Sequence, residues 1–386
     1  MRNATESLGN PRLLRIMNER LILARLRESG PASRVDLARA TGLSKPTVSA
    51  ALTGLIDAGL AHLVGEVSGR PGPVTSLYDM NAGAAHVLGV DIGREWVRVA
   101  VADLRGEILA RCDGRNSAVT ATALVRRIRT LAHRAVSQAA VSALTCAVIG
   151  SPGVFDPGTG RMEFAPNLPG WGEAGLIDRL QRSLGVPLIV ENDVNLAAAG
   201  EHAYGHGRGK DHFVLVSIGT GVGMGIVIGG RLYTGAQGAA GEISYLPSDD
   251  ASSSDALTRG STESVVAAPG IVRAAHRAGL AYATAKEVFA AAADGDAAAS
   301  ALIDAEGRRI GGLLVAVTAV LDPEIVVLGG GVGRNVDLLE KPMNERIAEL
   351  GPLRPKVVAS TLGEAGVLRG AIARGVDHAW SVIGQG

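Results

Sequence analysis

One succession of elements occurs twice in the chain, and this duplication constrains the fold more than any other feature. A buried strand at 87–92 enters a glycine loop at Gly93, and another strand follows at 96–102. A buried strand at 214–218 enters the glycine loop 219–221 and is also followed by a strand. In both copies a tight turn then leads to a third strand. The pattern predicts two related α/β lobes with a cleft between them, and two unrelated hairpins are the alternative.

Three short helices are predicted before the first copy. A first helix ends near Gly30, Ser33 and Asp36 form a capping box that opens a second, and Ser44 caps a third. The apolar residues of the third helix are spaced so that they face a core. These residues are Val48, Leu52, Leu55 and Ile56.

Two short strands, 60–67 and 74–78, follow the third helix and flank a loop rich in glycine and proline. Three helices and such a hairpin make a winged helix-turn-helix, which places its third helix in the major groove of DNA. A small helical domain used for dimerisation is the alternative. The residues expected to contact DNA from the second helix, the third helix and the wing tip are Arg34, Lys45, Thr47, Ser49 and Arg70.

The charge balance makes any contact with nucleic acid a local one. The chain has 38 Lys+Arg and 38 Asp+Glu, so a basic surface over the whole protein is excluded. Up to Met80, ten basic residues exceed seven acidic ones. The small positive excess therefore lies in the region with the predicted DNA-binding motif.

The cysteine count and the apolar stretches indicate a cytoplasmic protein. Cys112 and Cys146 are the only cysteines, which excludes a disulfide scaffold and a zinc site of several cysteines. The N-terminal twenty residues lack the apolar core of a secretory signal. The longest apolar stretch, 310–321, is too short to cross a membrane and predicts a buried helix. The alanine-rich stretch 283–312 is expected to form one helix.

Two segments of the duplicated region have residues suited to chemistry. The loop 219–225 has glycines that let backbone N–H groups approach a phosphate, although it matches neither the dinucleotide-binding fingerprint nor a P-loop. The segment 191–195, Glu-Asn-Asp-Val-Asn, follows a strand. Its carboxylates could take a proton from a substrate hydroxyl, or the segment could simply cap a helix. His202, His206 and His212 cluster nearby and are interpreted as solvated rather than metal-binding.

Together these motifs resemble the ROK family (repressor, open reading frame, kinase) in its form with a DNA-binding N-terminus. The resemblance covers nearly the whole chain. It implies two ribonuclease-H-like lobes of the actin and hexokinase type, with a sugar and ATP in the cleft. The motifs that carry it are Ser33-Arg34, Leu43-Ser44, Gly69-Arg70-Pro71, 165–171, 191–195, Gly219-Thr220-Gly221, Gly241-Glu242-Ile243 and 328–331.

The resemblance also implies roles for single residues. Asp193 would be the catalytic base if the protein were a kinase. The residues expected to line the sugar are Asn167, Asn192, Asp193, Glu242, Tyr245 and Glu263. The residues expected in vestigial nucleotide loops, with Asp91 near the magnesium position, are Asp91, Gly93, Gly219, Thr220, Gly221, Gly330 and Gly331.

Departures from the family pattern favour a sensor over an enzyme. Kinases of the family have Gly-Gly-Thr where this chain has Gly93-Arg94-Glu95, so a hydroxyl donor is lost and negative charge is added near the phosphates. Tyr245 replaces a zinc-binding histidine, and 252–262 contains no cysteine. No metal or other cofactor is therefore expected, and ATP with magnesium would apply only to a kinase.

These inferences predict two domains and one function. Residues 1–80 form the winged DNA-binding domain, and 81–386 form the kinase-like domain, with lobes at about 85–200 and 201–386. The predicted function is a repressor that a sugar or sugar phosphate releases from operator DNA, acting as a homodimer or a dimer of dimers. Three alternatives remain: an active sugar kinase with a DNA-binding head, a regulator that answers to a protein through an inactive cleft, and an activator.

Overall fold

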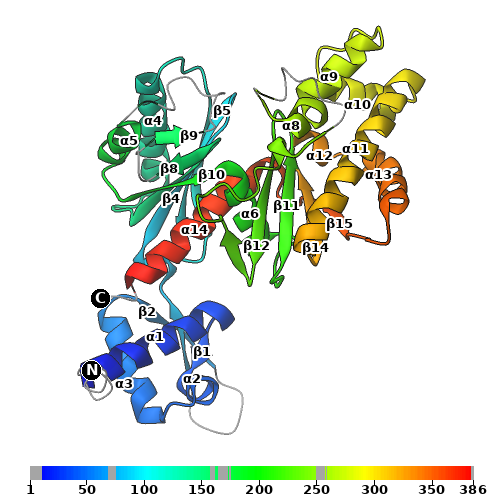
Figure 1. The fold of residues 1–386 in the computed structure, drawn as a ribbon. Helices are drawn as coiled ribbons and strands as arrows, with labels where there is room; N and C mark the ends of the chain where they lie inside the picture. The colour runs from blue at the N-terminus through cyan, green and yellow to red at the C-terminus, as the bar shows by residue number, and fades with distance from the viewer. Residues whose placement is uncertain are drawn as a thin grey trace, which may run out of the picture.

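A computed structural model describes residues 11–67, 75–156, 161–163, 173, 175–248, 257 and 259–383. A small N-terminal unit, called the head below, lies beneath two α/β lobes (Figure 1). The head consists of α1 (Pro11–Ser29), β1 (Ala32–Ser33), α2 (Arg34–Thr41), α3 (Lys45–Asp57), β2 (Ala61–Val67) and β3 (Thr75–Met80). Its strands form one antiparallel sheet in the order β1-β3-β2.

The predicted helix caps of the head are confirmed. Ser33 Oγ accepts a hydrogen bond from the Asp36 N–H at 3.1 Å, and the reciprocal bond completes the capping box. Ser44 Oγ accepts from the Thr47 N–H at 3.3 Å. The expectation that Ile56 faces the core is wrong, because its side chain is 39% exposed. Leu55 already fills the inward position of that last turn, and Ile56 lies about 100° further round the helix.

Each lobe is built on a five-stranded mixed sheet, and the two sheets have the same topology. In each, three antiparallel strands joined by turns are followed by two parallel strands. The predicted duplication is therefore confirmed. The first sheet, in the order β10-β7-β4-β5-β6, consists of β4 (His86–Ile92), β5 (Trp96–Asp103), β6 (Ile108–Arg115), β7 (Cys146–Ser151) and β10 (Leu188–Asn192). The second, in the order β13-β12-β11-β14-β15, consists of β11 (Phe213–Ile218), β12 (Val222–Ile228), β13 (Arg231–Tyr233), β14 (Ile325–Gly329) and β15 (Val357–Ala359).

Helices cover both faces of the sheets. The outer face of the first sheet carries α4 (Ala121–Ala139), with α5 (Leu176–Leu184) packed on it. Strands β8 (Val154–Asp156) and β9 (Arg161–Glu163) form a separate small ribbon. Among the described residues, the second lobe also has α8 (Ser261–Val266), α9 (Ala268–Arg277), α10 (Ala285–Ala293), α11 (Ala297–Leu321), α12 (Gly330–Gly333) and α13 (Val336–Leu350). The part of the chain that the structure describes also has three short 3₁₀ segments, η1 (Ala82–Ala84), η2 (Ile243–Tyr245) and η3 (Gly363–Ala365).

Two helices lie back to back between the sheets. Helix α6 (Asp193–Tyr204) packs on β11 and β12 of the second sheet, and α14 (Gly366–Ile383) packs on β4 and β7 of the first (Figure 1). Their backbones approach so closely that a Cβ on Gly370 would collide with the carbonyl of Leu196. A Cβ on Gly200 would likewise collide with the Gly366 carbonyl. The glycines therefore allow the two helices to pack as one layer between the lobes.

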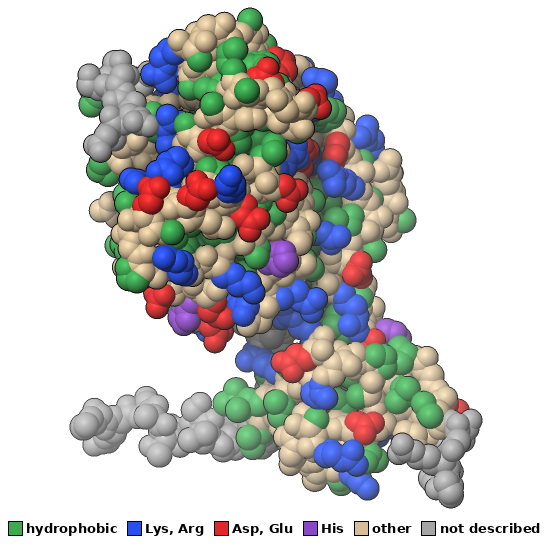
Figure 2. All heavy atoms as spheres, turned by 90° about the vertical axis from the view of Figure 1, so that its right-hand side faces the viewer, with side chains coloured by type: hydrophobic (Ala, Val, Ile, Leu, Met, Phe, Trp, Pro, Cys, Tyr) green, Lys and Arg blue, Asp and Glu red, His purple; other side chains and the backbone are tan. Residues whose placement is uncertain are grey.

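The head and the first lobe share one hydrophobic core. Ile22 and Leu26 of α1 belong to the same buried cluster as Leu104 and as Ile372 of α14. Two ion pairs cross the same junction. Arg27 Nη2 lies 2.9 Å from Asp377 Oδ1, and Arg105 Nη2 donates to both carboxylate oxygens of Asp79 at 2.6 and 2.7 Å. Figure 2 shows this junction as a narrow waist, with Lys and Arg side chains gathered on the body beside it.

The expectation of one alanine-rich helix over 283–312 is wrong. The chain forms α10 up to Ala293 and starts α11 at Ala297. Gly295, with φ of +90°, ends the first helix, and Asp296 Oδ1 accepts from the Ala299 N–H at 2.7 Å to cap the second. The predicted buried helix over 310–321 is the second half of α11. Within the described residues, no helix is long and apolar enough to cross a membrane.

A buried carboxylate in α11 makes the stability of the second lobe dependent on pH. Glu306 is 1% exposed, and neither of its carboxylate oxygens has a hydrogen-bond partner among the described residues. Burial raises the pKa of Glu306 to about 8, although Arg309, 3.5 Å away, opposes the shift. The folded state therefore holds a proton that the unfolded chain releases near its ordinary pKa.

We expect the free energy of unfolding to fall as pH rises from about 5 through 8. A raised pKa in the folded state stabilises the protein below the unfolded pKa, and that stabilisation is lost as pH rises through the folded pKa, here on the order of 5 kcal/mol. Glu306→Gln should remove most of this slope, whereas Asp304→Asn, at an exposed site on the same helix, should keep it. Urea unfolding at pH 6 and pH 9 measures the difference, and equal slopes in wild type and Glu306→Gln would contradict the prediction.

Candidate functional site

Two cavities adjoin each other in the cleft between the lobes. One, of about 430 Å³, is lined by acidic side chains and is called the carboxylate cavity below. The other, of about 830 Å³, is lined by the glycine loops and is called the glycine-loop cavity. Both volumes lie in the range of small-molecule sites in proteins.

The carboxylate cavity collects the residues that were predicted to bind a sugar. Those that line it are Asn192, Asp193, Glu242, Tyr245 and Glu263. Asn167, the sixth predicted residue, lies outside the described residues. These side chains come from the start of α6, from η2 and from α8, so segments far apart in the sequence meet here. Their roles in binding stay predictions.

The start of α6 fixes two of these residues. Asn192 Oδ1 accepts from the N–H groups of Val194 and Asn195 at 2.9 and 3.1 Å, while its Nδ2 donates to the Gly153 carbonyl at 3.1 Å. Asp193 Oδ1 accepts from the Val194 N–H at 2.8 Å. The cap proposed as an alternative for 191–195 thus exists, and the same cap holds the Asp193 carboxylate at the cavity wall.

Three carboxyl groups in this cavity have raised pKa values. Burial is the main cause for Asp193, for Glu242 and for Glu263. The charges of Asp193 and Glu263 raise the pKa of Glu242 further. Glu263 is held by the Val222 N–H, which donates to its Oε2 at 3.0 Å. Grouped carboxyl oxygens are strong acceptors, and they suit a ligand that presents several hydroxyl donors.

The glycine-loop cavity holds most, but not all, of the predicted nucleotide-loop residues. Gly93, Gly219, Thr220 and Gly331 line it, while Gly221 lines the carboxylate cavity. Two of the predicted nucleotide-loop residues, Gly330 and Asp91, line neither cavity. Gly330, with φ of +79°, lies so close to the backbone of Ile218 that a Cβ would collide with it. Asp91, the other, is buried and paired with an arginine.

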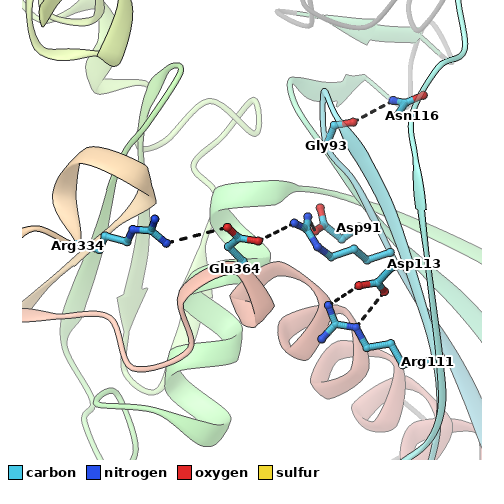
Figure 3. A network of polar contacts seen from close by, with 8 residues as sticks. Asp91, Gly93, Arg111, Asp113, Asn116, Arg334 and Glu364 are labelled. Atoms are coloured by element: carbon cyan, nitrogen blue, oxygen red, sulfur yellow. Dashed lines mark hydrogen bonds and ion pairs between the residues drawn. The ribbon is translucent and has the colours of Figure 1, made fainter. Parts of the chain in front are cut away.

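An ion-pair network connects Asp91 to the second lobe (Figure 3). Arg98 on β5 donates from Nη1 to Asp91 Oδ2 at 3.1 Å and from Nη2 to Glu364 Oε2 at 2.9 Å. Glu364 in turn lies 4.0 Å from Arg334 at the end of α12. Burial raises the pKa of Asp91 to about 6, against the opposing charge of Arg98. The network joins the lobes at the base of α14.

This network was not predicted, although one half of it has a signal in the sequence. Asp91 and Arg98 are opposite each other in the antiparallel register of β4 and β5. Counting outward from the loop between the strands would have paired them, because residues directly opposite on such a hairpin lie side by side. Glu364 comes from a segment more than 260 residues away, and no local pattern indicates its position.

The predicted DNA-contacting residues lie on different parts of the head. Lys45 is exposed at the first turn of α3, and Ser49 is partly buried one turn later. The Thr47 hydroxyl is 2.8 Å from Ser44 Oγ. Arg34 stacks over the ring of Tyr78, with its guanidinium 4.5 Å from the ring centre. Arg70 lies outside the described residues.

The three histidines that cluster in the sequence make separate contacts. His202 stacks against Phe213, and His212 Nδ1 accepts from the Gly229 N–H at 3.4 Å. His206 donates its backbone N–H to Glu201 at 2.9 Å. No group of three or more potential metal ligands exists in the described part of the chain.

Comparisons with known proteins agree with both halves of this architecture. A model described as the ROK family matches residues 87–374, and a model described as winged helix-turn-helix DNA-binding matches residues 18–61. A glucokinase of Thermotoga maritima is 32% identical over 316 residues, which cover 74% of this chain and 96% of that protein. A xylose repressor of Bacillus subtilis is 27% identical over 241 residues, which cover 60% of this chain and 61% of the repressor.

A solved structure shares the whole fold. The crystal structure of a ROK family transcriptional regulator, described as a homolog of the E. coli MLC protein, matches with a TM-score of 0.78 and 23% identity. The match covers 96% of this chain and 98% of that one. The winged head and the two-lobed body predicted from the sequence are confirmed.

Proposed function

Because the chain belongs to the ROK family and carries a winged helix-turn-helix head, we propose that it is a transcriptional repressor that a sugar releases from operator DNA. The head would hold the operator through α3, and the carboxylate cavity would bind the sugar. The xylose repressor of Bacillus subtilis, similar over 241 residues, supports this assignment. The two-fold symmetry of a homodimer would match a palindromic operator.

The observation that carries the proposal is that the contacts at the two ends of α14 connect both lobes to the head. Glu364, two residues before α14 begins, bridges Arg98 of the first lobe and Arg334 of the second. Near its other end, Asp377 binds Arg27 of the head. A ligand that changes the angle between the lobes would alter the first contact, and α14 would carry the change to the head. Release requires that the ligand bind the two lobe arrangements with different affinity, typically by about 1–3 kcal/mol.

The residues at the nucleotide position do not fit a magnesium–triphosphate. The Asp91 carboxylate, which a magnesium ion would need, is occupied by the Arg98 guanidinium. Glu95 lines the glycine-loop cavity and would repel the phosphates. We therefore propose that the protein senses its sugar without phosphorylating it. The residues do not fit a structural zinc ion of several cysteines either, since Cys112 and Cys146 are both buried in the first lobe.

A second function, sugar phosphorylation, is favoured by two observations. The glucokinase of Thermotoga maritima is 32% identical, and Asp193 lines the cavity where a kinase would need its base. In that case the head would be attached to a working enzyme.

Operator binding and its release by sugars test the proposal. We expect the purified full-length chain to enrich a palindromic DNA by in vitro selection, and one or more sugars from a panel of neutral and phosphorylated monosaccharides to release that DNA in a fluorescence anisotropy assay. The same sugars should raise the melting temperature. No ATP turnover is expected with any of them.

Three results would contradict the proposal. ATP-dependent phosphorylation that disappears in Asp193→Ala would establish a kinase. If no sugar of the panel shifted the melting temperature or the DNA affinity, the cleft would not be a sugar site. The regulator would then be controlled by a partner protein. Tighter operator binding in the presence of the sugar would exclude sugar-induced release.

A further inference from the structure

Helix α1, which crosses the head in Figure 1, has an apolar face that no described residue covers. Leu13, Leu14, Met17 and Leu21 are each between 38% and 54% exposed, and no other helix among the described residues exposes as many large apolar side chains. Apolar side chains that gather on a surface, rather than occurring singly, mark a contact with another molecule. The face is called the α1 stripe below and consists of Leu14, Met17, Leu21 and the exposed Ala24, with Leu13 beside them.

The α1 stripe lies almost opposite the face by which α1 packs in the head. Ile22 is fully buried there, and Arg15 and Glu19, paired at 2.8 Å, lie against Gly54 of α3. Since successive residues of a helix are about 100° apart, the stripe is centred about 150° round α1 from these residues. A molecule that covers the stripe therefore leaves α3 accessible to DNA.

The spacing of the stripe suits a second copy of the same helix. Its residues follow each other at intervals of three, four and three positions, which is the repeat of the apolar seam between two paired helices. In an antiparallel pair with its two-fold axis beside Met17, Leu14 packs on the partner's Leu21 and each Met17 packs beside its equivalent. The stripe is thus complementary to itself.

The charges that border the stripe favour the antiparallel arrangement. In a parallel pair, Arg20 would face the partner's Arg25, and Glu28 would lie beside its own equivalent. Like charges at such short range destabilise a helix pair. In the antiparallel pair, Arg20 instead lies over the partner's Leu13, where its aliphatic stem can cover the leucine while its guanidinium stays in water.

We propose that α1 is the contact between the heads of two copies of this chain, which pair antiparallel along the α1 stripe. Five side chains from each copy are fewer than the roughly 20 residues that each partner gives to a stable interface. The contact therefore joins heads that DNA or the bodies have already brought together. It goes beyond the proposed function, since the pairing of the stripes does not depend on a sugar.

The pairing also fixes the distance between the two α3 helices. Because α3 and the stripe lie on opposite sides of α1, the order across the pair is α3, α1, the partner's α1 and the partner's α3. Packed helices lie about 9 Å apart, so the two α3 axes would lie about 27 Å apart. This distance is close to the separation of about 34 Å between half-sites one helical turn apart on DNA. Half-sites two turns apart are too distant for heads in this contact.

Cross-linking of the full-length chain through introduced cysteines tests the contact and its direction. Both native cysteines are buried, so a short bis-maleimide should join two copies of Met17→Cys. Co-expressed Leu14→Cys and Leu21→Cys should cross-link at least tenfold faster than either variant alone, because only antiparallel pairing brings these two positions together. Val35→Cys, at an apolar position of α2 that is 45% exposed, is the matched control in the same head and should give no dimer.

Binding to DNA tests the consequence of the contact. The palindrome that the wild type selects in vitro should have half-site centres about 10 base pairs apart. Met17→Glu should bind this palindrome about tenfold more weakly and a single half-site unchanged, because pairing would bury two like charges side by side. The melting temperature should stay the same, since Met17 is 54% exposed. Val320→Glu, at an exposed position of α11, is the control and should bind both DNAs as the wild type does.

Each contrary result points to a different error. A Met17→Cys chain that forms no cross-linked dimer would overturn the inference, whether residues 1–10 or another protein covers the stripe. Leu14→Cys that cross-links alone as fast as the co-expressed pair would overturn the antiparallel arrangement. Unchanged affinity of Met17→Glu for the palindrome would show that the heads bind DNA without touching, which also overturns the inference. A chain that selects no DNA would refute the proposed function, and the cross-linking would still decide whether the heads pair.

Discussion

Asp193→Ala is expected to abolish sugar-induced release while leaving operator affinity unchanged. The Asp193 carboxyl lines the carboxylate cavity, fixed there by the Val194 N–H, and it is an acceptor for the hydroxyls of the ring. Removing an acceptor in a buried cavity leaves the ligand's hydroxyl donors without a partner and costs on the order of 3 kcal/mol, which is about a hundredfold in affinity. Sugar concentrations that release the wild type should therefore have no effect on the variant.

Fluorescence anisotropy of a labelled operator, titrated with the sugar at fixed protein concentration, measures this effect. Asp304→Ala is the matched control, because Asp304 is an exposed aspartate on α11 outside both cavities. Operator affinity without sugar should agree among wild type and both variants. Sugar-induced release that persists in Asp193→Ala would show that the ring is held elsewhere.

Lys45→Ala is expected to weaken operator binding about tenfold and to lower its dependence on salt. Lys45 is exposed at the first turn of α3, the helix that enters the major groove in this motif. If Lys45 contacts a phosphate, its loss removes one released counterion, and the slope of log affinity against log salt concentration falls by about 1. If it contacts a guanine edge, the loss also relaxes the sequence preference.

Binding isotherms measured at salt concentrations between about 50 and 200 mM give the slope and distinguish a phosphate contact from a guanine contact. Lys341→Ala, at an exposed lysine of α13, is the matched control and should change neither quantity. Arg70→Ala at the predicted wing tip should act in the same direction as Lys45→Ala. An unchanged affinity together with an unchanged slope in Lys45→Ala would refute the assigned docking of α3.

Much of the fold follows from local patterns in the sequence. The strand, glycine loop and strand at 87–102 recur at 214–228, and the two sheets built from them have the same order. The caps at Ser33 and Ser44 depend on residues three positions apart, so the sequence alone indicates them. The break between α10 and α11 was not predicted because the alanines on both sides are compatible with one continuous helix, and Gly295 and Asp296 are the local residues that end one helix and cap the next.

Site residues could be predicted where they belong to a local sequence motif. Contacts between segments that are far apart in the sequence could not. Asp193 and Glu242 came from the family resemblance, and the structure places both in one cavity. The pairing of Arg98 with Asp91 could have been read from the hairpin register. The bridge through Glu364 depends on a segment returning from the C-terminal region, and the position of Arg94 between two cavities depends on how the lobes face each other.

The common core of head and first lobe has a consequence for recombination between relatives. Tyr78 and Met80 close the head and are buried against the same cluster as Val376 and Ala379 near the C-terminus. A head transplanted from a relative would meet a foreign surface on α14, so a working chimera should need the matching C-terminal helix as well. Exchange of DNA specificity within this architecture is therefore expected to involve both ends of the polypeptide together.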